Sequence, residues 1–250
     1  MTELREFVSI AQSEFDYDRL TWQKQIPTFH PETAQEAARF MALANQHRQR
    51  LFIVGFSNII TPEGPSFDEF VAIKSDRLNN LIEINGKDLF VTVGSGYPLR
   101  EINRHLTEHN LFVPHSDLPY VGSVGGALAV GLTAEMHGHE VPLSRYFLKA
   151  EIVTPEGEII TPGSVCFKSV SGYDIVKIYS GSWGLLGFIV SASLRVMPDT
   201  GREDYATMQQ NSVDRAGLIK DLDESNTDPD AIYSRKIKTK FDPNNVLPLV

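Results

Sequence analysis

The sequence is poor in cysteine and has no long apolar run. Cys166 is the only cysteine of the 250 residues, so the chain can form no internal disulfide and no cysteine-based metal site. No stretch reaches the roughly 18 apolar residues of a membrane-spanning helix. Residues 1–20 also lack the apolar stretch of a signal peptide. We therefore expect a cytoplasmic protein without a membrane span.

Positive charge is also in short supply. The chain has 23 Lys and Arg against 32 Asp and Glu, which gives a formal net charge of -9. Such a surplus of negative charge disfavours binding to a nucleic-acid backbone or to an anionic membrane. With 42% hydrophobic and 22% charged residues, the composition is that of a globular protein with one or two buried cores.

The first half of the chain predicts a mixture of helices and short strands. Residues 1–26 form a polar, partly helical lead-in, and the apolar positions of residues 32–48 recur at helical spacing. A second helix is predicted over residues 98–110. Residues 51–54 predict a buried strand that feeds a loop. Strand-length apolar pieces at residues 70–73, 81–84 and 89–93 indicate a small sheet, with Asn85-Gly86 as a tight turn before the last.

The second half begins with a stretch rich in glycine and proline, residues 113–131, that is too apolar to be a linker. Strands are predicted at residues 149–153 and 158–160, which form a hairpin, and at residues 165–167 and 187–196, with residues 174–179 helical. Residues 199–227 are polar and acidic and are interpreted as a peripheral segment. The apolar character that returns at residues 240–247 predicts packing back onto the core.

Three loops containing glycine follow predicted strands or open predicted helices. They are residues 54–58, residues 122–129, and residues 171–174 together with 181–187. Exposed backbone N–H groups in such loops can hold an anionic ligand. Each loop also has a purely structural interpretation: a turn after a strand, tight helix packing, or a turn-rich β connection. None has the G-x-G-x-x-G spacing of a Rossmann site, so the ligand hypothesis depends on the three loops together.

The order and spacing of these features over residues 27–198 resemble the FAD-linked oxidase family. This is the p-cresol methylhydroxylase-type FAD-binding domain of the vanillyl-alcohol oxidase superfamily, most similar here to the FAD subunits of glycolate oxidase and D-lactate dehydrogenase. The longest match is KSVSGYDIVKIYSGSWGLLGFI, residues 168–189. Residues 68–85 and the FDPNNVL motif at residues 241–247 also look like family segments.

The resemblance implies an α+β protein with the two-subdomain p-cresol methylhydroxylase-type FAD-binding fold. We expect a lead-in (residues 1–26), a first FAD-binding subdomain (27–94), a second (95–198), and a short peripheral segment with the closing motif (199–250). Relatives carry a separate cap domain between the positions that match Pro198 and Phe241. In this chain a minimal C-terminal segment stands in its place.

By position, the resemblance implies a non-covalent FAD site, because residues 51–64 contain no histidine for a linkage to flavin and Cys166 is expected to be buried packing. Relatives have several glycines in the first loop, where this chain has only Gly55. Trp183 and Leu185 replace the usual Glu and Thr of the third loop, and Thr133-Ala134 replaces a glycine pair. The expected cofactor-binding residues are Ile53, Val54, Gly55, Phe56, Ser57, Asn58, Pro119, Gly122, Ser123, Val124, Gly125, Gly126, Tyr173 and Ile189.

Candidates for chemistry are few. His137 and His139, with Glu140, form a compact polar cluster beside the expected flavin loop, where they could bind a metal or act as acid and base. A solvated loop is the alternative and the favoured interpretation. Arg145 could reach a substrate carboxylate or brace the loop. No metal site is predicted.

The resemblance predicts an FAD-dependent oxidoreductase of the glycolate oxidase type that acts on a CH–OH group and transfers hydride from a small organic substrate to flavin. It also leaves open an FAD-bearing subunit whose partner supplies a cap or an electron acceptor. The alternative is a non-catalytic relative that serves as an interaction or accessory subunit, which the single glycine of the first loop and the absence of a cap motivate.

Overall fold

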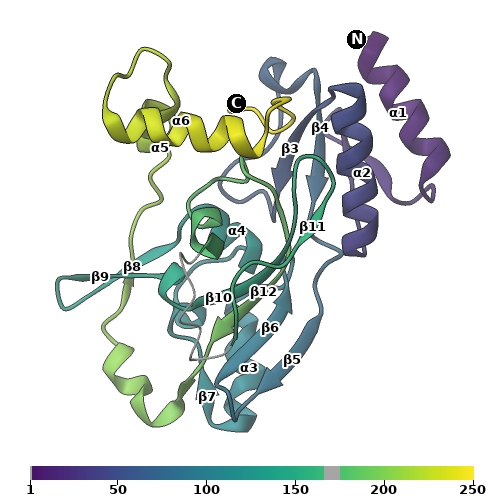
Figure 1. Cartoon of the computed structure of the whole chain (residues 1–250). Coiled ribbons are helices and arrows are strands. Elements are labelled where there is room, and N and C mark those ends of the chain that lie inside the picture. Colours follow the sequence, from purple (N-terminus) through teal and green to yellow (C-terminus); the bar gives the residue numbers. More distant parts are fainter. Residues whose placement is uncertain (1, 166–174) are drawn as a thin grey trace.

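The computed structural model describes residues 2–165 and 175–250 and builds them around two sheets (Figure 1). The smaller sheet has the strand order β1-β2-β4-β3, with β4 parallel to both of its neighbours, and α1 and α2 cover one face. Its elements are α1 (Thr2–Glu14), β1 (Leu20–Gln23), β2 (Ile26–Phe29), α2 (Ala34–His47), β3 (Arg50–Val54), the 3-10 helix η1 (Pro65–Phe67) and β4 (Phe70–Lys74).

Helix α2 confirms the helix predicted over residues 32–48. Thr33 caps its start, because the Thr33 hydroxyl accepts the N–H of Glu36 at 3.1 Å. Arg48 ends it in the left-handed conformation. The buried face of α2 carries Phe40, whose ring stacks on Phe29 of β2 with the ring centroids 3.9 Å apart. Helical spacing therefore produced both the helix and its contact with the sheet.

The larger sheet is antiparallel, with the strand order β11-β10-β12-β6-β5. Short helices pack on it around an apolar core that includes Val91, Leu99, Val124 and Ala192. Its strands are β5 (Leu81–Asn85), β6 (Phe90–Gly94), β10 (Phe147–Val153), β11 (Ile159–Ile160) and β12 (Phe188–Arg195). The helices are η2 (Leu99–Glu101), α3 (Ile102–Leu106), η3 (Thr107–His109), η4 (Pro114–Asp117), α4 (Val124–Ala129), η5 (Leu143–Arg145) and η6 (Ile175–Tyr179).

The strand pairing places the boundary between the two sheets at other residues than the predicted subdomain boundaries. β6 pairs with β12, so residues 81–94 lie in the larger sheet, whereas the prediction grouped them with the strand that is β4 here. The boundary expected at residue 94 therefore separates β5 and β6 from the other three strands of the larger sheet. At the other end, α1 and β1 of the lead-in belong to the smaller unit, because Phe7 and Ala11 are buried in its core and β1 pairs with β2.

Two further predicted elements are confirmed in position. The helix expected at residues 98–110 is the succession η2, α3 and η3, and the hairpin expected at residues 149–160 is β10–β11. The Asn85 side chain accepts the N–H groups of Lys87 and Asp88, which forms the predicted turn. Most of the strand expected at residues 165–167 lies outside the described residues.

The peripheral segment ends in a helical hairpin and a return to the core. Helices α5 and α6 lie above α4 in Figure 1, and the chain then runs back to the smaller sheet. There the N–H of Leu51 donates to the carbonyl of Val246 at 2.7 Å, and Val246 and Leu247 are buried, as predicted for residues 240–247. The remaining elements are β7 (Leu111–Phe112), β8 (Thr133–Met136), β9 (His139–Pro142), β13 (Met197–Pro198), η7 (Asp199–Tyr205), β14 (Gln209–Gln210), α5 (Ala216–Leu222) and α6 (Pro229–Phe241).

Among the described residues, no helix combines the length and the hydropathy needed to cross a bilayer.

A partly buried hydrogen-bonded pair joins the end of β2 to the end of β4. His30 Nδ1 lies 2.8 Å from Asp76 Oδ1, and Lys74 Nζ lies 3.7 Å from the other oxygen. Burial of Asp76 opposes its ionisation, but the hydrogen bond to His30 and the charges of His30, Lys74 and Arg77 outweigh it, so the pKa of Asp76 is below its usual value of 3.8. The resulting stabilisation is present above the unfolded-state pKa and is lost as the pH falls through the lowered folded-state pKa.

We therefore expect Asp76→Asn to lower the free energy of unfolding at pH 7 by about 1 to 2 kcal/mol. The difference from the parent protein should shrink at acid pH, where Asp76 itself becomes protonated. Urea unfolding at pH 7 and pH 3 measures both. Glu69→Gln, which removes an exposed partner of Arg50, is the control and should change little. An equal loss for Asp76→Asn at both pH values would contradict the ionic origin.

Candidate cofactor site

Three loops and the last residues of the chain meet where the smaller sheet adjoins the larger one. They surround a cavity of about 90 Å³. The lining is mostly apolar and aromatic, with hydroxyl and amide side chains on one loop and a single guanidinium. It consists of Leu51, Phe52, Ile53, Phe56, Ser57, Asn58, Ile59, Ile60, Tyr120, Gly122, Gly126, Ala129, Val130, Trp183, Gly184, Leu185, Arg215, Leu247, Pro248, Leu249 and Val250.

The first loop follows β3. Ser57 has a φ of 61°, which turns the backbone into the left-handed region, and its carbonyl accepts the hydroxyl of Thr61. The Asn58 amide donates to the carbonyl of Val121 at 2.9 Å and ties the first loop to the second. A Cβ at Gly55 would lie 2.9 Å from the Ser123 hydroxyl. A side chain at this position would therefore displace the Ser123 hydroxyl where the two loops approach each other.

The second loop leads into α4. The Ser123 hydroxyl caps this helix by accepting the N–H of Gly126 at 3.1 Å. The N–H of Gly125 donates to the carbonyl of Ser95 at 2.8 Å, and a Cβ at Gly125 would lie 2.7 Å from Ser95 Cβ. Gly125 therefore serves helix packing. Gly126 faces the cavity beside Tyr120, whose pKa burial raises to about 12.

The third loop precedes β12. Its backbone is held to the end of α4, because the N–H of Gly181 donates to Leu128 and the N–H of Trp183 donates to Ala129. Trp183 has a φ of 53°, which is unfavourable for a bulky residue. Its ring faces the guanidinium carbon of Arg215, 5.9 Å from the ring centroid. Trp183 thereby joins the third loop to the peripheral segment.

A second, smaller cavity of about 30 Å³ lies between the same loops. That volume suits about one water molecule. The Ser95 hydroxyl is buried there without a hydrogen-bond partner among the described residues. The lining comprises Ile53, Ser75, Ser95, Gly125, Gly126, Ala129, Ser182, Gly184, Gly187, Phe188 and Ile189. The lining of the smaller cavity is thus mostly apolar, and the Ser95 hydroxyl is a polar group in it without a partner among the described residues.

Most of the expected cofactor residues lie at these two cavities. Ile53, Phe56, Ser57, Asn58, Gly122 and Gly126 line the larger one, Gly125 and Ile189 line the smaller one, and Gly55 and Ser123 touch between them. Val54 and Val124 are instead buried in apolar cores. Pro119 is exposed and is not part of either lining. Tyr173 and Cys166 lie outside the described residues.

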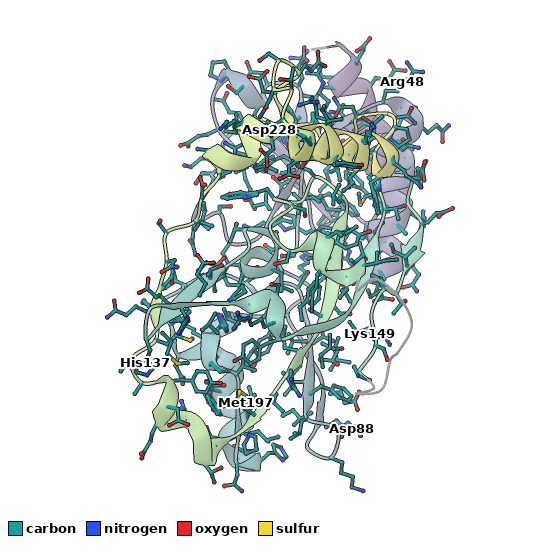
Figure 2. All side chains as sticks on the ribbon, turned by 60° about the vertical axis from the view of Figure 1, so that its left-hand side comes forward. Arg48, Asp88, His137, Lys149, Met197 and Asp228 are labelled. Atoms are coloured by element: carbon teal, nitrogen blue, oxygen red, sulfur yellow. The ribbon has the colours of Figure 1, made fainter. Side chains whose placement is uncertain are left out.

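The histidine cluster is separate from the loops. His137 and His139 are exposed in the β8–β9 hairpin, and Figure 2 shows His137 far down the molecule from Arg48. Arg145 is also exposed, and none of the three is among the lining residues of the two cavities. In the described part of the chain, no three His, Cys, Asp or Glu side chains are grouped so that they could hold a metal.

Sequence reasoning did not find several lining residues. Trp183 stood out only as a departure from the family pattern, and Tyr120 follows directly on the expected Pro119. Arg215 lies in the polar segment 199–227, where nothing distinguishes it from other charged residues. Leu247 is the last residue of the FDPNNVL motif and residues 248–250 follow it, and their apolar character is the one signal that could have indicated them.

The chemistry of the lining fits the diphosphate and the rings of FAD. The loops supply hydroxyl and amide side chains and aromatic faces, and the peripheral segment supplies one guanidinium. The volume of the cavity is too small for FAD. Pockets for such ligands usually measure about 300 to 1,000 Å³, and this cavity measures about 90 Å³. Entry of a dinucleotide therefore requires displacement of part of the lining.

Two sheets with glycine loops at their junction define the class of p-cresol methylhydroxylase-type FAD-binding folds. The chain belongs to the FAD binding domain family, which matches residues 27–163, more than half of its length. Among solved structures, alkyldihydroxyacetonephosphate synthase is similar, with a TM-score of 0.62 and 20% identity over 78% of this chain and 40% of that one.

Two curated relatives share this part of the sequence. D-lactate dehydrogenase of Archaeoglobus fulgidus is 25% identical over 67% of this chain and 38% of its own length. Glycolate oxidase subunit GlcD of Bacillus subtilis is 23% identical over 74% of this chain and 40% of its own. The chain thus spans about two fifths of the length of these relatives.

Proposed function

We propose that this chain is the FAD-binding part of a flavoprotein oxidoreductase that acts on a CH–OH group. The observation that carries the proposal is the meeting of residues 53–58, 122–126 and 182–189 around two adjoining cavities at the junction of the sheets. The names of the relatives, D-lactate dehydrogenase and glycolate oxidase subunit, favour a small hydroxy acid as substrate.

The residues of the first two loops would hold the diphosphate. Ser57 and Asn58 offer donors from the first loop, and Gly122 and Gly126 allow close approach of the backbone. Ile189, at the start of β12, would lie toward the adenine end. When bound, FAD supplies the acceptor for hydride, and the protein supplies binding and orientation. Residues 51–64 contain no histidine or cysteine, so we propose that FAD is held non-covalently.

The substrate side of the proposed site requires more than these loops. The relatives are more than twice as long as the matched part of this chain, so a further domain or a second subunit would cover the flavin and supply a cap or an electron acceptor. The exposed β8–β9 hairpin, with His137 and His139, and nearby Arg145 are available to such a partner. We assign these three residues no chemical step.

An accessory role is the second candidate. Trp183, Arg215 and residues 247–250 fill space at the loops, and the larger cavity is well below the volume of a usual cofactor pocket. If these groups stay in place, the domain would act as an interaction module that keeps the fold without the cofactor.

Absorbance and thermal unfolding of the purified protein decide between the two functions. A flavoprotein should show absorption bands at about 370 and 450 nm. Added FAD at about 100-fold its Kd should stabilise the native state by about 2.7 kcal/mol. Gly126→Val, which places a side chain in the lining, should remove this stabilisation, whereas Gly201→Val, in open space, should retain it. A colourless protein that FAD does not stabilise would exclude the flavoprotein.

A further inference from the structure

Arg215 is the one charged side chain among the described residues that line the larger cavity. It comes from the peripheral segment, just before α5, and reaches the loops of both sheets. The chain as a whole carries a net charge of -9. A cation placed at this cavity therefore stands out against an acidic background and marks a location suited to an anion.

Val250 and Trp183 hold the Arg215 guanidinium in place, and at least one of its N–H donors has no acceptor among the described residues. One terminal nitrogen, Nη2, donates to the backbone oxygen of Val250, and the group faces the Trp183 ring. Nε is buried and has no acceptor among the described residues. A buried N–H without an acceptor is costly, and native structures rarely leave one unpaired. The group therefore has unused capacity for an oxygen ligand.

A diphosphate matches that capacity. Guanidinium groups bind phosphate through two parallel N–H donors, a geometry that a lysine cannot reproduce. The first loop has only Gly55 where several glycines would bring more backbone N–H groups to the phosphates. Resting on the function proposed above, we propose that Arg215 binds the diphosphate of FAD, whose oxygens take the position that the Val250 oxygen holds in this structure.

Arg215 has a second conceivable role, which is purely structural: its contact with Val250 could serve only to hold the last residues of the chain in place. If Arg215 only latches residues 247–250 over the cavity, its removal frees the entrance and FAD binds more tightly. If Arg215 binds the diphosphate, its removal weakens FAD. The two roles thus predict changes of opposite sign.

The test compares FAD with riboflavin, which lacks phosphate, as ligands of the full chain. Binding is followed by quenching of flavin fluorescence for the parent protein, Arg215→Ala, Arg215→Lys and Lys220→Ala. Arg215→Ala should raise the Kd for FAD about 10- to 100-fold, as loss of a charge-assisted hydrogen bond does, and Arg215→Lys should give a smaller rise. The Kd for riboflavin should not change. Lys220→Ala removes the same charge from exposed α5 and should leave both constants unaltered.

Three outcomes overturn the proposal. Unchanged or tighter FAD binding by Arg215→Ala, with FAD bound by the parent protein, refutes the role of Arg215 and leaves the flavoprotein intact. An equal loss of riboflavin and FAD affinity would show that Arg215 supports the loops without binding phosphate. Absence of FAD binding by the parent protein removes the proposed function and this inference with it. Thermal unfolding without ligand verifies that each variant is folded. If Arg215→Ala does not fold, the Kd values of Arg215→Lys are compared with those of the parent protein instead.

Discussion

Replacement of Asp242 by alanine should lower the free energy of unfolding by about 3 to 5 kcal/mol. The Asp242 side chain is fully buried at the end of α6 and pairs with Lys238 Nζ at 2.5 Å. Its two oxygens also accept the N–H groups of Val246 and Leu247, each at 2.8 Å. The substitution leaves the largely buried Lys238 without its partner and releases the segment that returns to the smaller sheet.

Urea unfolding at pH 7 measures this loss. Asn244→Ala is the matched control, because Asn244 is exposed in the same turn and makes one side-chain hydrogen bond, to Asn45. We expect the control to stay within about 0.5 kcal/mol of the parent protein. A loss below about 1 kcal/mol for Asp242→Ala would mean that the closing segment is held by the apolar contacts of Val246 and Leu247 and by the hydrogen bond from Leu51, without a large contribution from Asp242.

The stability of the protein should decrease by about 3 kcal/mol between pH 6.5 and pH 4 because of His115 alone. His115 is fully buried, its Nε2 lies 2.8 Å from the carbonyl of Val141, and its Nδ1 has no partner among the described residues. Burial lowers the pKa of His115 from 6.5 to about 4, and the hydrogen bond to Val141 only partly offsets it. Within this window the unfolded chain binds a proton that the folded chain does not.

This difference in bound protons sets the direction in which the free energy of unfolding changes with pH. Stability rises with pH wherever the unfolded state binds more protons, so the contribution is full above pH 6.5 and is lost as the pH falls toward the folded-state pKa of about 4. His115→Gln should therefore flatten the curve of unfolding free energy against pH over this window. The exposed His109→Gln should leave the slope unchanged. Urea unfolding at intervals from pH 4 to pH 7 gives both slopes, and equal slopes for the parent protein and His115→Gln would contradict the assignment.

Local pattern was a good guide to the elements of this fold. Helix α2 follows from the spacing of its apolar residues, and the β10–β11 hairpin follows from two apolar runs around a turn. Local pattern did not assign β5 and β6 to a sheet. An alternating strand looks the same beside any partner, and β6 is about 100 residues away along the chain from β12, with which it pairs.

Some features of the candidate site were also predictable from the sequence, and others were not. The glycine loops could be expected from the family resemblance, because each carries its own motif. The positions of Trp183 and Arg215 could not, since their contact joins two segments that share no motif. The expectation that His137 and His139 lie beside the flavin loop rested on their nearness in sequence. The β8–β9 hairpin carries them into solvent instead.

By itself the sequence determined the family, the nature of most elements and the loops that carry glycine, because these depend on periodicity and on motifs within short stretches. The tertiary structure alone decided which sheet each strand joins, how narrow the cavity between the loops is, and that one arginine from the peripheral segment reaches it. These features depend on contacts between residues far apart in the chain. Such contacts result from the packing of whole layers, and no local pattern encodes that packing.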